Sequence, residues 1–220
     1  MKAILIFGIA LGLAMLTSPV KTSAQHLSLG AKAGAGLSNI SNFESGGGSI
    51  KRSPNVMVQG GFIMKYMFGD LIGIKTEVLF QQKGEVYSGT TSSAKFKIYL
   101  NYITLPILVE VSHTFGNITL FGGAGPYMGY ALNGKVVAIN PSSGSINLTF
   151  GKGDFRRFDT GLCFDLGGGA KAGPGNLFLN LRFDLGLMDL SQPTTKPSGY
   201  KTHDTRNFGI SAGYLIPIGK

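Results

Sequence analysis

The sequence is poor in cysteine, tryptophan and charged side chains. Its 220 residues include one cysteine, Cys163, no tryptophan and only 14% charged residues, against about 25% in ordinary soluble domains. A single cysteine cannot form an internal disulfide. The three histidines, His26, His113 and His203, are far apart in the chain and lack the spacing of metal ligands. We therefore expect neither a bound metal nor a cofactor.

Long hydrophobic runs are also missing, except at the start of the chain. Lys2 is followed by the apolar run 3–16 and by a small and polar stretch that ends at Ala24. This layout predicts a cleaved secretory signal peptide over residues 1–24. The run is shorter than the roughly 20 residues of a membrane-spanning helix. We expect one exported domain, residues 25–220, that has no transmembrane helix.

Alternation with a period of two residues is the strongest pattern that is present. In the stretch 176–190 the alternate residues from Leu177 to Leu187 are all apolar, whereas the other side carries Arg182 and Asp184. In a soluble sandwich the apolar side would form the core and the charged side would face water. In a membrane barrel the apolar side contacts lipid and the charged side faces the lumen.

Eight stretches show this alternation, and the connections between them decide between the two readings. The stretches are 27–37, 55–68, 71–84, 96–112, 118–132, 155–167, 176–190 and 207–218. Long connections (39–54, 85–95, 133–153, 191–206) alternate with short ones (69–70, 113–117, 168–175). This asymmetry is typical of small outer-membrane barrels, so the sequence predicts an all-β, eight-stranded antiparallel up-and-down transmembrane β-barrel. Pro106 cannot donate a ladder hydrogen bond, so we expect a bulge or local break there.

The inward sides of these strands gather charged residues of both signs. An eight-stranded barrel is about wide enough for side chains to fill it, and each unpaired buried charge would cost several kcal/mol. We expect a structural network of paired charges that fills the lumen; a proton or ion path is the alternative. The expected members are Lys32, Lys65, Lys75, Glu77, Glu110, Arg157, Asp159, Asp165, Arg182 and Asp184.

Catalysis has little support in the sequence. His113 falls in a short connection and His203 in a long one, which places them at opposite ends of the barrel and separates the parts of a nucleophile–histidine–acid site. His203 and Asp204 could pair locally, but we interpret them as part of a solvated loop. We therefore expect a protein that is not an enzyme, with a lipid-modifying barrel enzyme as an alternative.

The long connections contain more basic than acidic residues. The basic residues in or beside them are Lys51, Arg52, Lys95, Lys135, Lys152, Lys196, Lys201 and Arg206, against Glu44, Glu85, Asp154, Asp189 and Asp204. A basic rim would attract the phosphates of lipopolysaccharide, although the surplus could equally be incidental loop polarity. We expect outer-membrane lipid as a partner, protein partners at the loops as a further option, and a monomer. Nucleic acid is not expected, because no aromatic residues interleave with the basic ones.

Three segments resemble the PorT-like outer-membrane β-barrel proteins of Gram-negative bacteria. They are Tyr99-Leu-Asn-Tyr-Ile-Thr-Leu-Pro-Ile-Leu108, Phe158-Asp-Thr-Gly161 and Arg182-Phe-Asp-Leu-Gly-Leu187. The resemblance implies an outer-membrane barrel and, as for some members, a part in protein secretion. We expect a non-enzymatic outer-membrane protein with a filled lumen; a secretion or surface-assembly component and a soluble ligand-binding barrel are further alternatives.

Overall fold

The computed structural model describes residues 26–40, 50–89, 95–140, 144–151, 155–191 and 203–218. The predicted signal peptide, residues 1–24, lies outside these ranges, as do Lys152, Lys196 and Lys201 of the predicted basic rim. Within the described ranges, no helix has the length and apolarity to cross a membrane.

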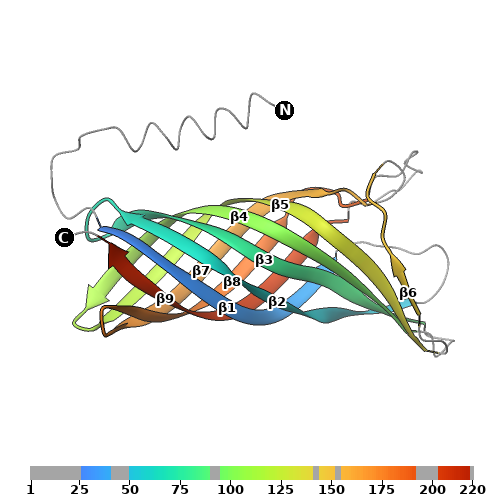
Figure 1. The fold of residues 1–220 in the computed structure, drawn as a ribbon, viewed down its shortest axis with the longest axis horizontal. Helices are drawn as coiled ribbons and strands as arrows, with labels where there is room; N and C mark the ends of the chain where they lie inside the picture. Colours follow the sequence, from blue (N-terminus) through green and yellow to red (C-terminus); the bar gives the residue numbers. More distant parts are fainter. Residues whose placement is uncertain are drawn as a thin grey trace, which may run out of the picture.

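Eight long antiparallel strands close into a barrel, as the sequence predicts (Figure 1). The ladder runs through β1 to β5 and then through β7, β8 and β9, and β9 pairs with β1 to close it. The strands are β1 His26–Ile40, β2 Ile50–Met67, β3 Ile72–Gly89, β4 Lys95–Phe115, β5 Ile118–Asn140, β6 Gly144–Asn147, β7 Phe158–Ala172, β8 Gly175–Gly186 and β9 Thr205–Ile218. Closure pairs both edges of the sheet, which a barrel in lipid requires.

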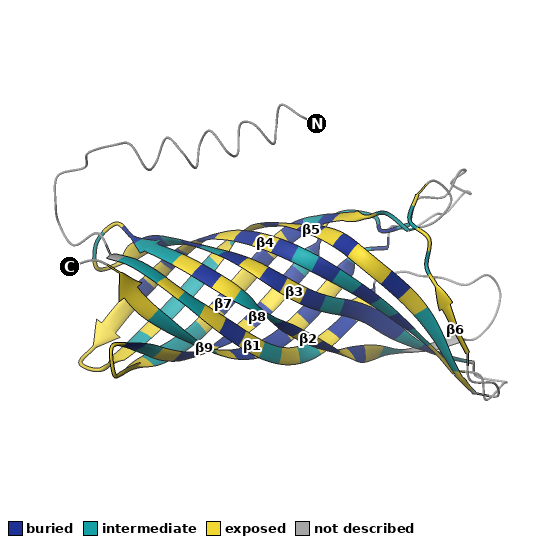
Figure 2. Ribbon diagram, in the orientation of Figure 1, coloured by how far each residue is buried: buried dark blue, intermediate teal, exposed yellow. Residues whose placement is uncertain are grey.

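The alternation in the sequence corresponds to the two faces of the barrel wall. Figure 2 shows buried and exposed residues alternating along most of each strand. Large apolar side chains point outward, with Phe62 74% and Leu166 65% exposed, whereas Arg182 is 1% exposed and lies inside. The same division holds for the stretch 176–190, where Leu177, Leu179 and Leu181 are exposed. An apolar outer surface and a polar interior are what lipid demands of such a barrel.

The two ends of the barrel differ. Residues 68–71, 116–117 and 173–174 form the tight connections of one end, which we call the short-turn end. Gly116 and Gly173 adopt φ angles of 62° and 60° there, a left-handed conformation that glycine adopts without steric cost. The opposite end, where the predicted long connections lie, is the long-loop end.

Several expected boundaries are wrong because the strands continue past the predicted apolar band. β3 runs to Gly89 and β5 to Asn140, so parts of the predicted loops 85–95 and 133–153 are strand. A ninth strand, β6, was not expected; it pairs only with β5, beyond the closed barrel. At Pro106 there is no bulge, since Leu105 pairs with Met128 and Val109 with Ala124 in the same register. The ladder is locally interrupted there, because the β3–β4 pairing skips residues 105–106 and the β4–β5 pairing skips residues 107–108. The register shifts between β4 and β5 lie at residues 95–96 and 101–102.

A basic side chain in the outer apolar band should destabilise the barrel. Ile107 is 50% exposed on the outer surface of β4, midway along the apolar positions 103–111. Ile107→Arg should cost about 2–4 kcal/mol in a bilayer, and the isosteric Ile107→Leu should cost little. Unfolding in lipid vesicles, followed by the shift of the folded band on an unheated gel, measures both variants. Equal stability of the arginine variant and the wild type would contradict a lipid-facing position.

Candidate functional site

The candidate site is the barrel lumen, where inward-facing polar side chains form three layers along the axis. From the short-turn end toward the long-loop end we call them the ion-pair layer, the amide layer and the Lys83 layer. The ion-pair layer comprises Lys32, Lys65, Lys75, Glu77, Glu110, Asp165 and Arg182. The amide layer comprises Gln59, Gln81, Asp184 and Ser211, and the Lys83 layer comprises Lys83, Tyr127, Asp159 and Thr205.

Arg182 lies at the centre of the ion-pair layer. Its Nε and Nη2 donate to the two carboxylate oxygens of Asp165 at 2.7 and 2.8 Å, and its Nη1 lies 2.7 Å from Oε2 of Glu77. The guanidinium therefore makes a bidentate pair with one carboxylate and reaches a second. These contacts join β8 to its neighbour β7 and, across the lumen, to β3.

Three lysines complete the ion-pair layer. Lys32 Nζ lies 2.9 Å from Glu77, and Lys75 Nζ lies 2.6 Å from Glu110 and 2.9 Å from Asp165. Lys65, which is partly exposed, contacts the other oxygen of Glu110 at 2.6 Å. Every carboxylate of the layer thus contacts two basic groups, the arrangement that offsets the cost of burying charge.

The amide layer is held by hydrogen bonds. Gln81 Nε2 donates to Asp184 Oδ2 at 2.6 Å, and Gln59 Nε2 donates to Ser211 Oγ at 2.9 Å. Gln81 Nε2 also lies 3.5 Å from Gln59 Oε1. These bonds connect β3 with β8 across the lumen, and β2 with β9, the two strands that flank β1.

The Lys83 layer encloses a fully buried ion pair. Lys83 Nζ lies 2.7 Å from Asp159 Oδ2, which also accepts hydrogen bonds from Tyr127 Oη and Thr205 Oγ1, each at 3.1 Å. The ammonium lies 5.1 and 4.6 Å from the ring centroids of Tyr102 and Tyr127. Ring faces attract cations, so the aromatic rings add to the stabilisation from the carboxylate.

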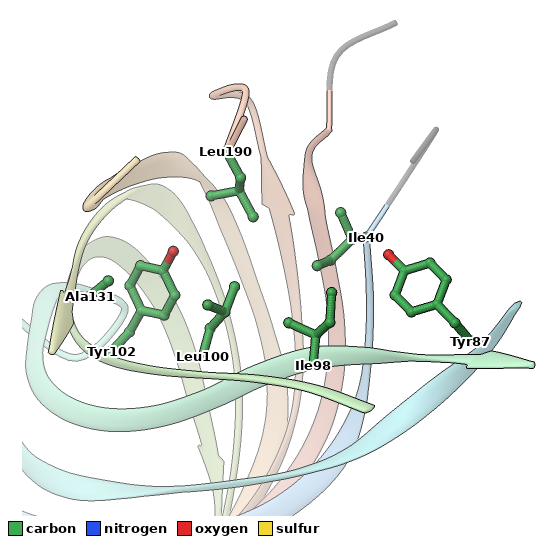
Figure 3. Packing of buried hydrophobic residues seen from close by; sticks show 7 residues of the cluster. All are labelled: Ile40, Tyr87, Ile98, Leu100, Tyr102, Ala131 and Leu190. Atoms are coloured by element: carbon green, nitrogen blue, oxygen red, sulfur yellow. The ribbon is translucent and has the colours of Figure 1, made fainter. Parts of the chain in front are cut away.

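An apolar cluster covers the Lys83 layer at the long-loop end. Figure 3 shows its side chains directed into the barrel mouth from β1, β3, β4, β5 and the segment after β8. Val136, Leu148, Phe150 and Phe155 pack against it. We call this cluster the apolar cap: Ile40, Tyr87, Ile98, Leu100, Tyr102, Ala131 and Leu190.

The short-turn end is open by comparison. A cavity of about 710 Å³ extends from Asp70 and His113 at the turns to Lys32 and Glu77 of the ion-pair layer. Phe121 and Phe178 line it and contact each other edge to face, with centroids 6.0 Å apart. The lumen is therefore a pocket that ends at the ion-pair layer.

The expected network has ten members, and Lys65 is the partly exposed one described above. Eight of the other nine are buried inside the barrel: Lys32, Lys75, Glu77, Glu110, Asp159, Asp165, Arg182 and Asp184. Arg157 is not, so its expected place is wrong. Arg157 precedes β7, is exposed, and holds its guanidinium over the rings of Tyr130 and Phe150 at 5.9 and 4.9 Å. The chain bends before β7 begins, so strand alternation does not extend back to residue 157.

Lys83 and Glu85 are the buried charges that sequence reasoning missed. Both are 0% exposed. On β3 the odd-numbered residues Lys75, Glu77 and Gln81 face inward, and Lys83 and Glu85 continue this series. Extending the alternation of the strand by these residues would therefore have predicted their inward positions. The sequence pattern instead assigns Glu85 to the basic and acidic residues of the loops, because the apolar alternation of this stretch ends at Gly84.

The histidines lie at the two ends of the barrel, as expected. His113 is exposed near the short turn 116–117, whereas His203 is buried at the long-loop end, so the prediction of a solvated His203 is wrong. Its Nδ1 lies 3.5 Å from Oδ1 of Asp189. Cys163 is buried inside the barrel. The described residues include no group of three or more histidine, cysteine or acidic side chains that could hold a metal ion.

The sequence matches a protein-family model that agrees with the observed barrel fold. A family model described as an outer membrane protein beta-barrel domain matches residues 22–192. The chain belongs to this family. The long-loop end of such a barrel faces outside the cell and the short-turn end faces the periplasm. The pocket therefore opens to the periplasm.

Two solved structures are similar to this chain at low sequence identity. OprG from Pseudomonas aeruginosa is 11% identical, with a TM-score of 0.52 over 90% of this chain and 97% of OprG. Neisserial surface protein A (NspA) is 12% identical, with a TM-score of 0.48 over 86% of this chain and 96% of NspA. No curated protein matches the sequence. At this identity the likeness to OprG shows the fold alone.

Removal of Arg182 should destabilise the barrel. Arg182→Leu would leave Asp165 and Glu77 with fewer basic partners, and breaking a buried pair in this way costs about 3–5 kcal/mol. Lys65→Gln is the matched control, because Lys65 is partly exposed and Glu110 would keep Lys75. The unfolding midpoint of each variant in detergent gives the result. A midpoint for Arg182→Leu as high as that of Lys65→Gln would contradict the central role of Arg182.

Lys83 and Asp159 should be coupled. Lys83→Met would leave a buried carboxylate with only hydroxyl donors, whereas Lys83→Met/Asp159→Leu removes both charges. Because an apolar pair can replace a buried ion pair at little cost, the double variant should be more stable than Lys83→Met. A double-mutant cycle in detergent measures the coupling, and strictly additive effects would argue against the pair.

Proposed function

We propose that this protein is a non-enzymatic outer-membrane barrel that does not conduct ions, because the layered polar network and the apolar cap close its lumen. The observation that carries the proposal is that every basic group of the three layers contacts a carboxylate; these groups are Lys32, Lys65, Lys75, Lys83 and Arg182. A closed barrel of this kind is a scaffold for whatever its outer surface and loops bind.

The energetics favour a lumen that stays closed. Opening a path through the ion-pair layer would separate Arg182 from Asp165 and Glu77. If breaking these buried pairs costs about 3–5 kcal/mol, open barrels would make up less than about one in a hundred molecules, since each 1.4 kcal/mol is a factor of ten. A path would also have to cross the Lys83 layer and the apolar cap, which lowers that population further.

The PorT-like segments support a more specific relationship. Two of the three contain residues of the lumen network: Asp159 in the segment 158–161, and Arg182 and Asp184 in the segment 182–187. The resemblance therefore includes the side chains that close the barrel. A role in a protein secretion or surface-assembly apparatus follows from the same resemblance as an alternative, and co-purification of a stable complex from outer membranes tests it.

The contact between His203 and Asp189 keeps a lipid-modifying enzyme as a second candidate. A buried imidazole 3.5 Å from a carboxylate at the outer end is a partial acid–base arrangement. An enzyme of this kind would change lipid A when overproduced, and His203→Ala would abolish that change. Unaltered lipid A in the mass spectrum would support the non-enzymatic function.

The closed lumen predicts that the purified protein shows no channel activity. In planar lipid bilayers the wild type should give no discrete current steps in symmetrical potassium chloride. The variant Arg182→Ser/Lys83→Ser/Tyr102→Ser should conduct, because it shortens a large side chain in the ion-pair layer, in the Lys83 layer and in the apolar cap. Its unheated gel band confirms that it is folded. Reproducible steps from the wild type would contradict the proposal.

A further inference from the structure

Three amide side chains form a ladder on the outer surface of the barrel. Gln82 Nε2 donates to Asn101 Oδ1 at 3.1 Å, and Asn101 Nδ2 donates to Asn133 Oδ1 at 2.7 Å. The ladder crosses β3, β4 and β5 side by side. On β4 it lies directly beyond the outward apolar residues of the range 103–111. A spanning strand needs about 9–11 residues, so the amides mark the outer edge of the hydrocarbon.

Basic side chains lie just beyond this edge. Lys135 pairs with Tyr99, two residues past Asn101 on β4, and Lys97 lies four residues past it. With a rise of about 3.3 Å per residue and a tilt of about 40°, these positions are roughly 5 and 10 Å beyond the ladder. The polar headgroup layer on each side of the hydrocarbon is about 5–8 Å thick. Lys135 is therefore at headgroup depth, and the flexible stem of Lys97 can reach it.

Arg157 adds a third cation to this side of the barrel. Its guanidinium lies over Tyr130, whose ladder partner Ile103 ends the apolar series on β4. Lys135 makes the equivalent contact with Tyr99, with its Nζ 5.6 Å from the ring centroid. Such tyrosines favour the membrane interface. We call Lys97, Lys135 and Arg157 the outer basic patch.

The described segments that carry and adjoin the patch have no acidic residue on the outer surface. Residues 95–101, 133–140, 144–151 and 155–158 contain no aspartate or glutamate, and Asp159 and Glu85 are buried inside the barrel. The basic groups of the lumen layers, by contrast, each contact a carboxylate. Anionic groups outside the protein are the natural partners of basic residues at a membrane surface.

We propose that the outer basic patch binds the phosphate groups of a phosphorylated glycolipid, such as the lipid A part of lipopolysaccharide, in the outer leaflet. Lys97 and Lys135 occupy diagonal positions on adjacent strands, about 7–8 Å apart at the backbone. They and Arg157 can therefore contact neighbouring phosphates of one headgroup or of two packed ones. The exposed apolar residues below the ladder, Leu105 and Tyr130 among them, contact the acyl chains of the same lipid. The site does not depend on closure of the lumen.

Native mass spectrometry of the full-length protein in detergent tests this site. The probes are bisphosphorylated lipid A, lipid A with its phosphates removed, and phosphatidylglycerol. Wild-type protein should retain bisphosphorylated lipid A, and Lys97→Gln/Lys135→Gln/Arg157→Gln should bind it at least tenfold more weakly. Phosphate-free lipid A should bind weakly to both. Lys135→Arg keeps the charge and should keep binding.

Lys171→Gln is the matched control for the single change Lys135→Gln, because Lys171 is an exposed lysine at the short-turn end. It should leave lipid A binding unchanged, whereas Lys135→Gln should weaken it. Equal affinity of the triple variant and the wild type, or equal losses in the two single variants, would overturn the site. Equal retention of phosphatidylglycerol and lipid A would overturn the choice of glycolipid. The current measurement above is independent of all these results.

Discussion

The bidentate pair between Arg182 and Asp165, extended to Glu77, is the interaction on which the interior depends. Arg182 comes from β8, Asp165 from β7 and Glu77 from β3, so the contacts join opposite walls of the barrel. Glu77 also contacts Lys32 of β1, and Asp165 also contacts Lys75 of β3. Lys75 in turn contacts Glu110, which lies on β4. Between the apolar cap and the short-turn end the interior is mostly polar, so such cross-lumen pairs take the place of core packing there. They fix the distance between the walls, which the backbone ladder alone does not.

The interior of the barrel requires that buried charges be balanced, and it depends less on which residue supplies each charge. The sequence pattern predicts Arg157 and not Lys83 in the lumen, whereas the structure has Lys83 there in place of Arg157, and the charges of the layers remain paired. Strand parity predicted which face each charge occupies, because alternation is a local property of the chain. Which charges meet across the lumen depends on barrel shear and tilt, which no single strand encodes. The Arg182–Glu77 and Lys83–Asp159 contacts could therefore not be assigned from the sequence.

The limits of the strands were predicted less well than their faces. The expected ends followed the apolar band, because the sequence signal is the alternation that lipid imposes. Beyond the band both faces of β3, β4 and β5 contact water or the cap, so polar and glycine-rich stretches there resemble loops. Lys83, Glu85 and the strand β6 all lie in or beside that extension. Arg157 is the opposite case, because the predicted strand begins at residue 155 but β7 begins at Phe158, so Arg157 lies outside the strand.

The strand extensions explain how the two faces of the same wall acquire different roles. Leu100 and Ile98 of the apolar cap alternate on β4 with Asn101, Tyr99 and Lys97 on the outer surface. The cap therefore lies past the amide ladder, where water would otherwise enter the lumen and hydrate the Lys83 layer. A wall that ended at the hydrocarbon edge could not carry that cap. By continuing, it excludes water from the buried ion pair on its inner face and holds the outer basic patch at headgroup depth on its outer face.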